Sequence, residues 1–379
     1  MPDKPEFLFA TCQVGAEAAL KHEVARRWPA FRFAYSRPGF VTFKLAGGQV
    51  LPADFDLEAV FARAYAFSLG KVTGRDSETL AAGVWKLWDN RPVKRLHVWE
   101  RDKGPPGEHG FEPSVTQAAI EAAEAISRES RVQSPESRVQ SPESRVQSKT
   151  LDSRLSALDS RLPRRGDMVL DCVLVEPEEW WVGFHQVHWV PSQWPGGMMP
   201  LELPPDAVSR AWLKMEEALR WSELPIPRGA RCAELGSAPG GATQALLGRG
   251  LEVLGIDPAE MHAAVLGHPR FTHVRQRATQ VRRRDFRKIR WLAADMNVAP
   301  QYTLDAVESI VAHPEVSVRG MLLTLKLLEW KLADELPAWL DRVRGWGYNL
   351  VRARQLQHNR QEVCVAALQK PFVRKPLRR

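Results

Sequence analysis

A glycine-rich segment in the second half of the chain has the composition of a ligand-binding turn. It follows an apolar stretch at residues 231–235 and reads GSAPGG over residues 236–241, before the helix-forming run ATQALL. Because glycine lacks a side chain, the backbone of such a turn can approach a bound molecule closely. In open α/β sheets the turn lies at the carboxyl edge of the strands, where nucleosides bind. We therefore predict a nucleoside site at this turn.

An acidic residue at the end of the next apolar stretch narrows the choice of ligand. Asp257 lies about twenty residues beyond the glycines, where a carboxylate can accept hydrogen bonds from ribose hydroxyls. NAD-binding proteins share this arrangement, but their fingerprint is G-x-G-x-x-G, whereas this chain has G-x-x-x-G-G with a proline inside it. We predict S-adenosylmethionine as the ligand; a nucleotide-dependent oxidoreductase and a glycine turn without a ligand are the alternatives. The predicted cofactor-binding residues are Glu234, Gly236, Ser237, Ala238, Pro239, Gly240, Gly241, Asp257 and Asp295.

Four charged residues are expected to meet beside this turn: Lys214, Asp295, Lys326 and Glu362. Asp295 and Lys326 each end a predicted strand, so both reach the carboxyl edge of a parallel sheet. Glu362 begins the last strand, which we expect to run the opposite way and so to start at that edge. Lys214 lies early in an amphipathic helix before the first strand. Singly, each has an ordinary explanation as a solvated charge or a cap, but their convergence predicts a catalytic site.

The elements that must position these residues form a regular series between residues 200 and 371. Seven apolar stretches predict strands, and helical stretches separate all but the last two: 231–235, 252–257, 271–274, 289–295, 320–326, 349–353 and 362–368. Alternation of strand and helix predicts a mainly parallel, Rossmann-like α/β sheet covered on both faces. A short connection at 355–361 makes the last pair a hairpin, so the last strand is antiparallel.

Composition and charge limit the class of protein. The chain has 379 residues and a net charge of +8, which favours a polyanionic partner such as RNA. No apolar run is long enough for a membrane helix, and the first residues lack the pattern of a secretory signal, so we expect a cytoplasmic protein. The four cysteines are far apart in apolar stretches and predict buried thiols, and we expect no metal site.

The N-terminal half is predicted to hold two further α+β parts. Residues 1–72 show a β-α-β-β-α-β order, with the second helix near 57–64, which is ferredoxin-like. Residues 73–190 form a mixed region that a low-complexity insertion, 129–165, interrupts. SPESRVQ occurs twice in this insertion, and each repeat contains a proline and one valine, so its period cannot build a coiled-coil seam. An arginine tail that contacts RNA is the functional alternative to a solvated insertion.

Deletion of residues 134–161, with a short flexible linker joining the ends, should leave the melting temperature and the ligand affinities nearly unchanged. The reason is that the sequence of this segment offers no apolar face to bury. Thermal unfolding of the shortened and full chains measures the effect. A large drop in melting temperature would show that the segment packs on the rest of the chain, and a selective loss of RNA affinity would make it a binding element.

The C-terminal half resembles the FtsJ-type ribose 2′-O-methyltransferases, whose Lys-Asp-Lys-Glu tetrad corresponds to the four charged residues above. More narrowly, the segments SRAWLKMEEAL, ELGSAPGG, WLAADM, LLTLKL and HNRQEVCVA are similar to the family of ribosomal RNA large subunit methyltransferase M. In the N-terminal half, TCQVGAEAALKHEV and DCVLVEPEEWWVGFH are similar, far less specifically, to the ferredoxin-like and RNA-binding THUMP parts of that family.

The resemblance implies a class I methyltransferase domain at 200–371, a ferredoxin-like subdomain at 1–72 and a THUMP-like region at 73–190. It also implies S-adenosylmethionine-dependent methylation of a ribose 2′-hydroxyl on a cytidine of large-subunit rRNA. We hypothesise that Lys326, its pKa lowered by Lys214 and desolvation, is the general base. Asp295 would orient Lys326, and Glu362 would hold Lys214 and the ribose. The alternatives are a methyltransferase acting on another RNA and a non-catalytic RNA-binding protein that keeps the fold.

One segment departs from the pattern of such methyltransferases, which commonly carry an acid after the third strand to hold the adenine. Here no acid follows residue 274 before Asp285, so we expect backbone groups to recognise the adenine. Residues 275–290 contain eight basic residues and one acid, which fits either phosphate contacts or an ordinary solvated surface.

Overall fold

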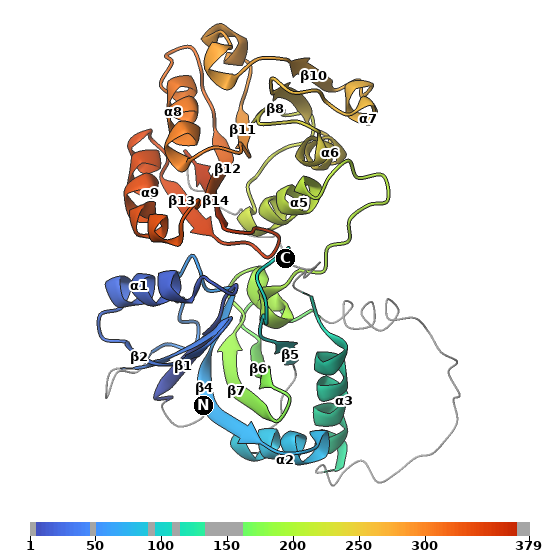
Figure 1. Cartoon of the computed structure of the whole chain (residues 1–379), viewed down its shortest axis with the longest axis vertical. Helices are drawn as coiled ribbons and strands as arrows, with labels where there is room; N and C mark the ends of the chain where they lie inside the picture. The colour runs from blue at the N-terminus through green and yellow to red at the C-terminus, as the bar shows by residue number, and fades with distance from the viewer. Residues whose placement is uncertain (1–4, 46–50, 90–94, 108–113, 133–161, 370–379) are drawn as a thin grey trace, which may run out of the picture. The chain divides into compact units, whose positions relative to one another are not determined.

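The computed structural model divides into two compact units, Met1–Met199 and Pro200–Arg379, each built round a seven-stranded sheet (Figure 1). It describes residues 5–45, 51–89, 95–107, 114–132 and 162–369, so the SPESRVQ repeats lie outside the described residues. Within these ranges, no helix has both the length and the apolar character needed to cross a membrane.

The seven strands of the first unit form one continuous sheet, in the order β2-β3-β1-β4-β7-β6-β5. All neighbouring strands are antiparallel except β5 and β6, which are parallel. The core on one part of the sheet includes Phe9, Phe40, Trp99 and Val173. The elements are β1 (Phe7–Thr11), α1 (Glu17–Arg27), β2 (Arg32–Arg37), β3 (Phe40–Lys44), β4 (Ala64–Thr73), α2 (Ser77–Leu87), β5 (Leu96–Glu100), α3 (Gln117–Val132), β6 (Met168–Glu176), β7 (Glu179–Gln186) and the 3-10 turns η2 (Pro191–Gln193) and η3 (Pro195–Gly197).

The helix predicted at residues 57–64 is not formed, and this prediction was wrong. The apolar residues of this segment recur at helical spacing, and they are buried. The backbone is nevertheless not helical, because Glu58 has a φ of 50°, outside the right-handed helical region. The backbone N–H groups of Val60 and Phe61 donate to the carboxylate of Glu23, at 2.9 and 3.2 Å. A side chain on α1 therefore satisfies the backbone of this segment in place of helical hydrogen bonds.

The boundary expected at residue 72 lies at the end of β4. This strand pairs with β7, with Val72 opposite Trp180, so both predicted N-terminal parts contribute strands to the same sheet. The division into a ferredoxin-like subdomain and a THUMP-like region stays a prediction.

The second unit has the strand order β10-β9-β8-β11-β12-β14-β13, in which β14 runs antiparallel to both of its neighbours and the other pairs are parallel. This confirms the Rossmann-like sheet with a reversed last strand. The elements are α5 (Ala211–Ser222), β8 (Arg231–Leu235), α6 (Gly241–Gly248), β9 (Glu252–Ile256), α7 (Ala263–Leu266), β10 (Phe271–Val274), η4 (Ala278–Gln280), η5 (Arg283–Phe286), β11 (Trp291–Ala294), α8 (Pro300–Val311), β12 (Gly320–Lys326), η6 (Trp330–Glu335), α9 (Leu336–Gly345), β13 (Leu350–Arg354) and β14 (Glu362–Leu368).

The central strands of this sheet are buried along nearly their whole length, which is why they appear in the sequence as continuous apolar runs. Leu235, Ile256 and Ala294 lie level with one another at the ends of three neighbouring parallel strands. The residues that follow them therefore emerge at one edge of the sheet, the carboxyl edge, where the predicted site residues lie.

Candidate active site

The four charged residues predicted to converge do meet in the second unit. Lys326 ends β12 directly opposite Glu362 at the start of β14, and its Nζ donates to Glu362 Oε2 at 2.7 Å. Lys214, on α5, donates from Nζ to Glu362 Oε1 at 2.8 Å and lies 2.6 Å from Asp295 Oδ2. The other oxygen of Asp295, just after β11, lies 3.4 Å from Lys326 Nζ. Two ammonium groups and two carboxylates thus alternate in a closed arrangement, which we call the charged ring.

The charged ring is largely withdrawn from water, and this sets the protonation of its members. Burial raises the pKa of Glu362, but the ammonium groups of Lys214 and Lys326 outweigh it and hold that pKa below its usual value. Burial lowers the pKa of Lys214, but Asp295 and Glu362 outweigh it and raise that pKa above its usual value. Lys214 is therefore an ammonium at neutral pH and is suited to donate hydrogen bonds.

The contacts also revise which acid serves which lysine. Asp295 is closer to Lys214 than to Lys326, at 2.6 against 3.4 Å, so it contacts both lysines, and its role in orienting Lys326 stays a prediction. Glu362 holds both lysines, one on each oxygen. The carboxylate of Glu362 is thus the group that fixes the two lysines relative to each other.

Two residues that support Glu362 were not predicted. Glu217, one helical turn after Lys214 on α5, accepts hydrogen bonds from the backbone N–H groups of Gln357 and His358, at 2.8 and 2.9 Å. Asn359 donates to Glu362 Oε1 at 3.4 Å. Both side chains are buried, at 2% and 1% exposure, and they hold the loop before β14. An acid one turn from Lys214, on the same side of the helix, is the feature of the sequence that could have indicated Glu217.

The glycine turn joins β8 to α6, as predicted, but its glycines are required by packing within the protein. Gly236 and Gly240 have φ values of +79° and +122°. A Cβ on Gly236 would lie 2.6 Å from the backbone oxygen of Asp295, and one on Gly240 would lie 2.6 Å from the side chain of Val265. A Cβ on Gly241 would collide with Ser209. Substitution of these glycines would strain the fold, so it cannot isolate a ligand contact.

Acceptors suited to a nucleoside surround this turn. Asp257, just after β9, accepts from the backbone N–H groups of Ala238 and Ala259, at 3.1 and 2.8 Å, and each of its oxygens keeps a further lone pair for a ribose hydroxyl. Glu234, at the end of β8, accepts from the hydroxyl of Thr243 at 2.6 Å through Oε2. In the part of the chain that the structure describes, Glu234 Oε1 is buried without a hydrogen-bond partner. Asp257 therefore has the acceptor chemistry that a ribose hydroxyl needs, and Oε1 of Glu234 remains available for one further hydrogen bond.

The remaining residues predicted to bind the cofactor build the turn itself. Ser237 is buried, and its hydroxyl lies 3.5 Å from the sulfur of Met261, whereas Ala238 and Pro239 form the middle of the turn. Asp295 connects this turn to the charged ring, because its backbone packs against Gly236 while its carboxylate contacts both lysines. The turn and the charged ring therefore form one continuous site.

The carboxyl group of Glu234 is expected to make the stability of the protein depend on pH. Burial raises the pKa of Glu234 to about 8, from 4.5 for a free carboxyl. The folded state thus holds this proton more tightly, so the stabilisation is complete below about pH 4.5 and is lost progressively as the pH rises to about 8. Glu234→Gln should flatten the pH dependence of the melting temperature in this range, whereas Glu252→Gln, at an exposed position, should not. An unchanged slope in Glu234→Gln would contradict the assignment.

The basic segment after β10 forms the turns η4 and η5. Part of its charge is used locally: Arg283 donates to the carbonyl of Val281, Arg287 pairs with Glu315, and Arg290 donates to the carbonyl of Ser317. The side chains of Arg277, Arg284 and Lys288 belong to exposed residues. A contact of this segment with phosphates stays a prediction.

The strand order, the reversed last strand and the charged ring at the carboxyl edge define a class I methyltransferase fold. Residues 207–337 match the family model described as FtsJ-like methyltransferase, so this part of the second unit is similar to the domains of that family, in agreement with the resemblance of its motifs. The match includes Lys214, Asp295 and Lys326, whereas Glu362 lies beyond its end.

Curated relatives support the narrower resemblance. The chain is 34% identical over 186 residues to "Ribosomal RNA large subunit methyltransferase M" of Laribacter hongkongensis. Proteins of the same name from Xylella fastidiosa and Halorhodospira halophila are each 35% identical, over 184 and 178 residues. Each match covers 46% of this chain and 51% of the relative, so the chain spans about half the length of the curated relatives it matches.

Among solved structures, TrmN from Thermus thermophilus aligns over 96% of this chain and 99% of its own, with 14% identity and a TM-score of 0.34.

Proposed function

We propose that the protein is an S-adenosylmethionine-dependent methyltransferase that methylates a ribose 2′-hydroxyl of RNA. The observation that carries this proposal is the continuity, through Asp295, of the glycine turn with the charged ring. The FtsJ-like domain supports methyl transfer as the reaction. The names of the curated relatives support large-subunit rRNA as the substrate, and we propose a cytidine as the target. Action on rRNA would place the protein in the cytoplasm.

The charged ring suits this reaction because attack by a hydroxyl requires alignment and removal of a proton. S-adenosylmethionine, when bound, supplies a methyl group on a positively charged sulfonium. Lys214 has two close carboxylate contacts and stays an ammonium, so it can donate a hydrogen bond to the ribose oxygen. Lys326 has one close carboxylate contact and a longer one, so we assign the acceptance of the hydroxyl proton to it. Its ammonium group must first release a proton to solvent, and the neutral amine then takes the proton of the hydroxyl and becomes an ammonium again.

The rRNA assignment is tested by mapping ribose methylation in rRNA from a strain that lacks the gene. We expect one 2′-O-methylated position of the large-subunit rRNA to lose its methyl group. The wild-type gene should restore it, and a gene carrying Lys326→Ala should not. An unchanged methylation map would contradict rRNA as the substrate.

A non-catalytic RNA-binding protein that keeps the fold is the second candidate, supported only by the charge of +8. The complete charged ring argues against it, because a protein that only binds RNA has no need to bury two lysines against two acids. Turnover on any RNA would eliminate this candidate.

A further inference from the structure

Three side chains of metal-ligating type meet in the first unit, far in sequence from the charged ring: His97 on β5, Asp171 on β6 and His185 on β7. His97 and Asp171 are direct partners in the parallel register, and His185 is opposite Val169, two residues from Asp171. Because side chains alternate between the faces of a sheet, these positions place all three on one face. One possible ligand atom from each lies within 4.8 Å of the other two.

The cluster is almost wholly removed from water, with side-chain exposures of 5% for His97, 1% for Asp171 and 11% for His185. Asp171 Oδ2 lies 2.6 Å from His185 Nδ1. Among the described residues, Asp171 Oδ1 has no hydrogen-bond partner, and it lies 3.8 Å from His97 Nδ1. A buried carboxylate oxygen without a partner is costly, and a cation between the three side chains would remove that cost.

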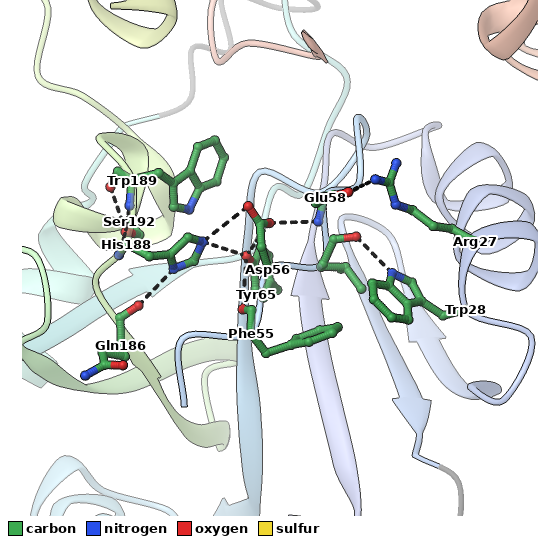
Figure 2. Close-up of polar contacts among 11 residues, drawn as sticks. Arg27, Trp28, Phe55, Asp56, Glu58, Tyr65, Gln186, His188, Trp189 and Ser192 are labelled. Atoms are coloured by element: carbon green, nitrogen blue, oxygen red, sulfur yellow. Dashed lines mark hydrogen bonds and ion pairs between the residues drawn. The ribbon is translucent and has the colours of Figure 1, made fainter. Parts of the chain in front are cut away.

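The backbone after β7 forms hydrogen bonds with both histidines. His185 Nε2 lies 2.8 Å from the carbonyl oxygen of Ser192, and the backbone of Gln193 forms a hydrogen bond with His97. Figure 2 shows how the segment leading to Ser192 is fixed: the Ser192 hydroxyl donates to the carbonyl of Trp189 at 2.7 Å. A histidine that binds a metal through one ring nitrogen usually donates its other N–H to such an acceptor.

A pocket opens beside the cluster and offers room for a further ligand such as water. Besides the three residues, its lining includes Tyr65, Trp99, His188, Trp189 and Trp194. The ring of His188 contacts other partners (Figure 2). Its Nδ1 lies 2.9 Å from the carbonyl oxygen of Gln186, and its Nε2 lies 3.0 Å from the Tyr65 hydroxyl. That hydroxyl donates to Asp56. His188 is thus a nearby histidine outside the cluster.

We propose that His97, Asp171 and His185 bind one divalent transition-metal ion of the zinc class, with a further coordination position open to the pocket. Two imidazoles and one carboxylate suit Zn²⁺ and neighbouring transition metals, whereas Mg²⁺ and Ca²⁺ prefer oxygen ligands. Donor atoms around tetrahedral zinc lie about 3.3 Å apart, so small rotations of Asp171 and His185 accommodate the ion. The ion would join β5, β6 and β7 to η2 and so stabilise the first unit. This role is independent of the proposed methyl transfer.

The protonation of the cluster is consistent with both a bound ion and its competitor, a proton. Burial lowers the pKa of His97, so its ring is neutral and has a lone pair for an ion. Burial also lowers the pKa of His185, but Asp171 outweighs it and raises that pKa, whereas burial raises the pKa of Asp171. Without an ion, His185 and Asp171 therefore share a proton across their 2.6 Å contact. The metal would take the place of the proton between them.

The test uses the untagged full chain, stripped with a chelator, dialysed and titrated with Co²⁺ and Zn²⁺. We expect one ion per chain by elemental analysis, visible ligand-field bands with Co²⁺ and a higher melting temperature with Zn²⁺. His97→Gln and Asp171→Asn should weaken binding by a factor of about 100 or more, since each removes a ligand. His188→Gln, the matched control, should bind as the wild type does.

Two results would overturn the proposal. One is a wild-type chain that gives no ligand-field bands and no stoichiometric Zn²⁺. The other is an equal loss of binding in His188→Gln, which would place the ion elsewhere in the pocket. If circular dichroism shows that the cluster variants do not fold, the titration of the wild-type chain alone decides.

Discussion

Replacement of Lys326 by alanine or by arginine is expected to slow single-turnover methyl transfer by a factor of about 100 or more. Alanine removes the proposed proton acceptor. Arginine keeps the positive charge and can still pair with Glu362, but it does not lose its proton at accessible pH. Both variants should bind S-adenosylmethionine with nearly wild-type affinity, because Lys326 is not among the predicted cofactor contacts, which lie on the glycine turn, Glu234, Asp257 and Asp295.

The control for this pair is Lys331→Ala, which removes an exposed lysine paired only with Glu329 among the contacts that the structure describes. It should leave both the rate and the cofactor affinity unchanged. Rates are measured on an rRNA fragment across a range of pH, and cofactor affinity is measured separately by calorimetry. A near wild-type rate for Lys326→Arg would contradict the proton-accepting role and leave a fixed positive charge as the function of Lys326.

Asp257→Ala is expected to weaken the binding of S-adenosylmethionine by a factor of roughly 10 to 100, the cost of losing charge-assisted hydrogen bonds to a ribose. Glu260→Ala is the matched control, because Glu260 is an acid three residues further along the same turn whose side chain is 81% exposed. Calorimetric titration of both variants gives the comparison. Equal affinities for the wild type and Asp257→Ala would contradict the predicted position of the ribose.

Asp257 also accepts hydrogen bonds from the backbone of Ala238 and Ala259, so its loss could loosen the glycine turn without any role in binding. The melting temperature without ligand separates the two effects. If the variant keeps the wild-type melting temperature and loses affinity, the carboxylate contacts the cofactor. Asp257→Asn keeps one oxygen acceptor for the backbone of the turn. If this variant has the wild-type melting temperature but still binds S-adenosylmethionine weakly, the carboxylate again contacts the cofactor.

Most of the second unit follows from local patterns in the sequence. Its strands begin and end within two residues of the predicted positions, because central strands covered on both faces are continuous apolar runs. The charged ring could be predicted because the direction of each strand decides which of its ends reaches the carboxyl edge. Once the last strand is taken as antiparallel, the end of β12 lies beside the start of β14, which makes Lys326 and Glu362 direct partners.

The features that were missed depend on contacts between segments distant in sequence. The segment at 57–64 has helical spacing, but Glu23 binds its backbone, and no local pattern shows that contact. Glu217 on α5 holds the loop before β14, and Asn359 in that loop donates to Glu362. His97 and Asp171 are separated by 74 positions in the sequence and meet only when β5 pairs with β6. Sequence spacing therefore gave no sign of this cluster, because its residues do not form a local motif.

The central claim is transfer of a methyl group from S-adenosylmethionine to a ribose 2′-hydroxyl, and product analysis tests it most directly. The purified chain is incubated with labelled S-adenosylmethionine and fragments of large-subunit rRNA, and the RNA is digested to nucleosides for mass spectrometry. The account predicts label in a 2′-O-methylated nucleoside, which we expect to be cytidine, and none with the Lys326→Ala variant. Label on a base, or no transfer by a chain that binds both S-adenosylmethionine and the RNA, would contradict it.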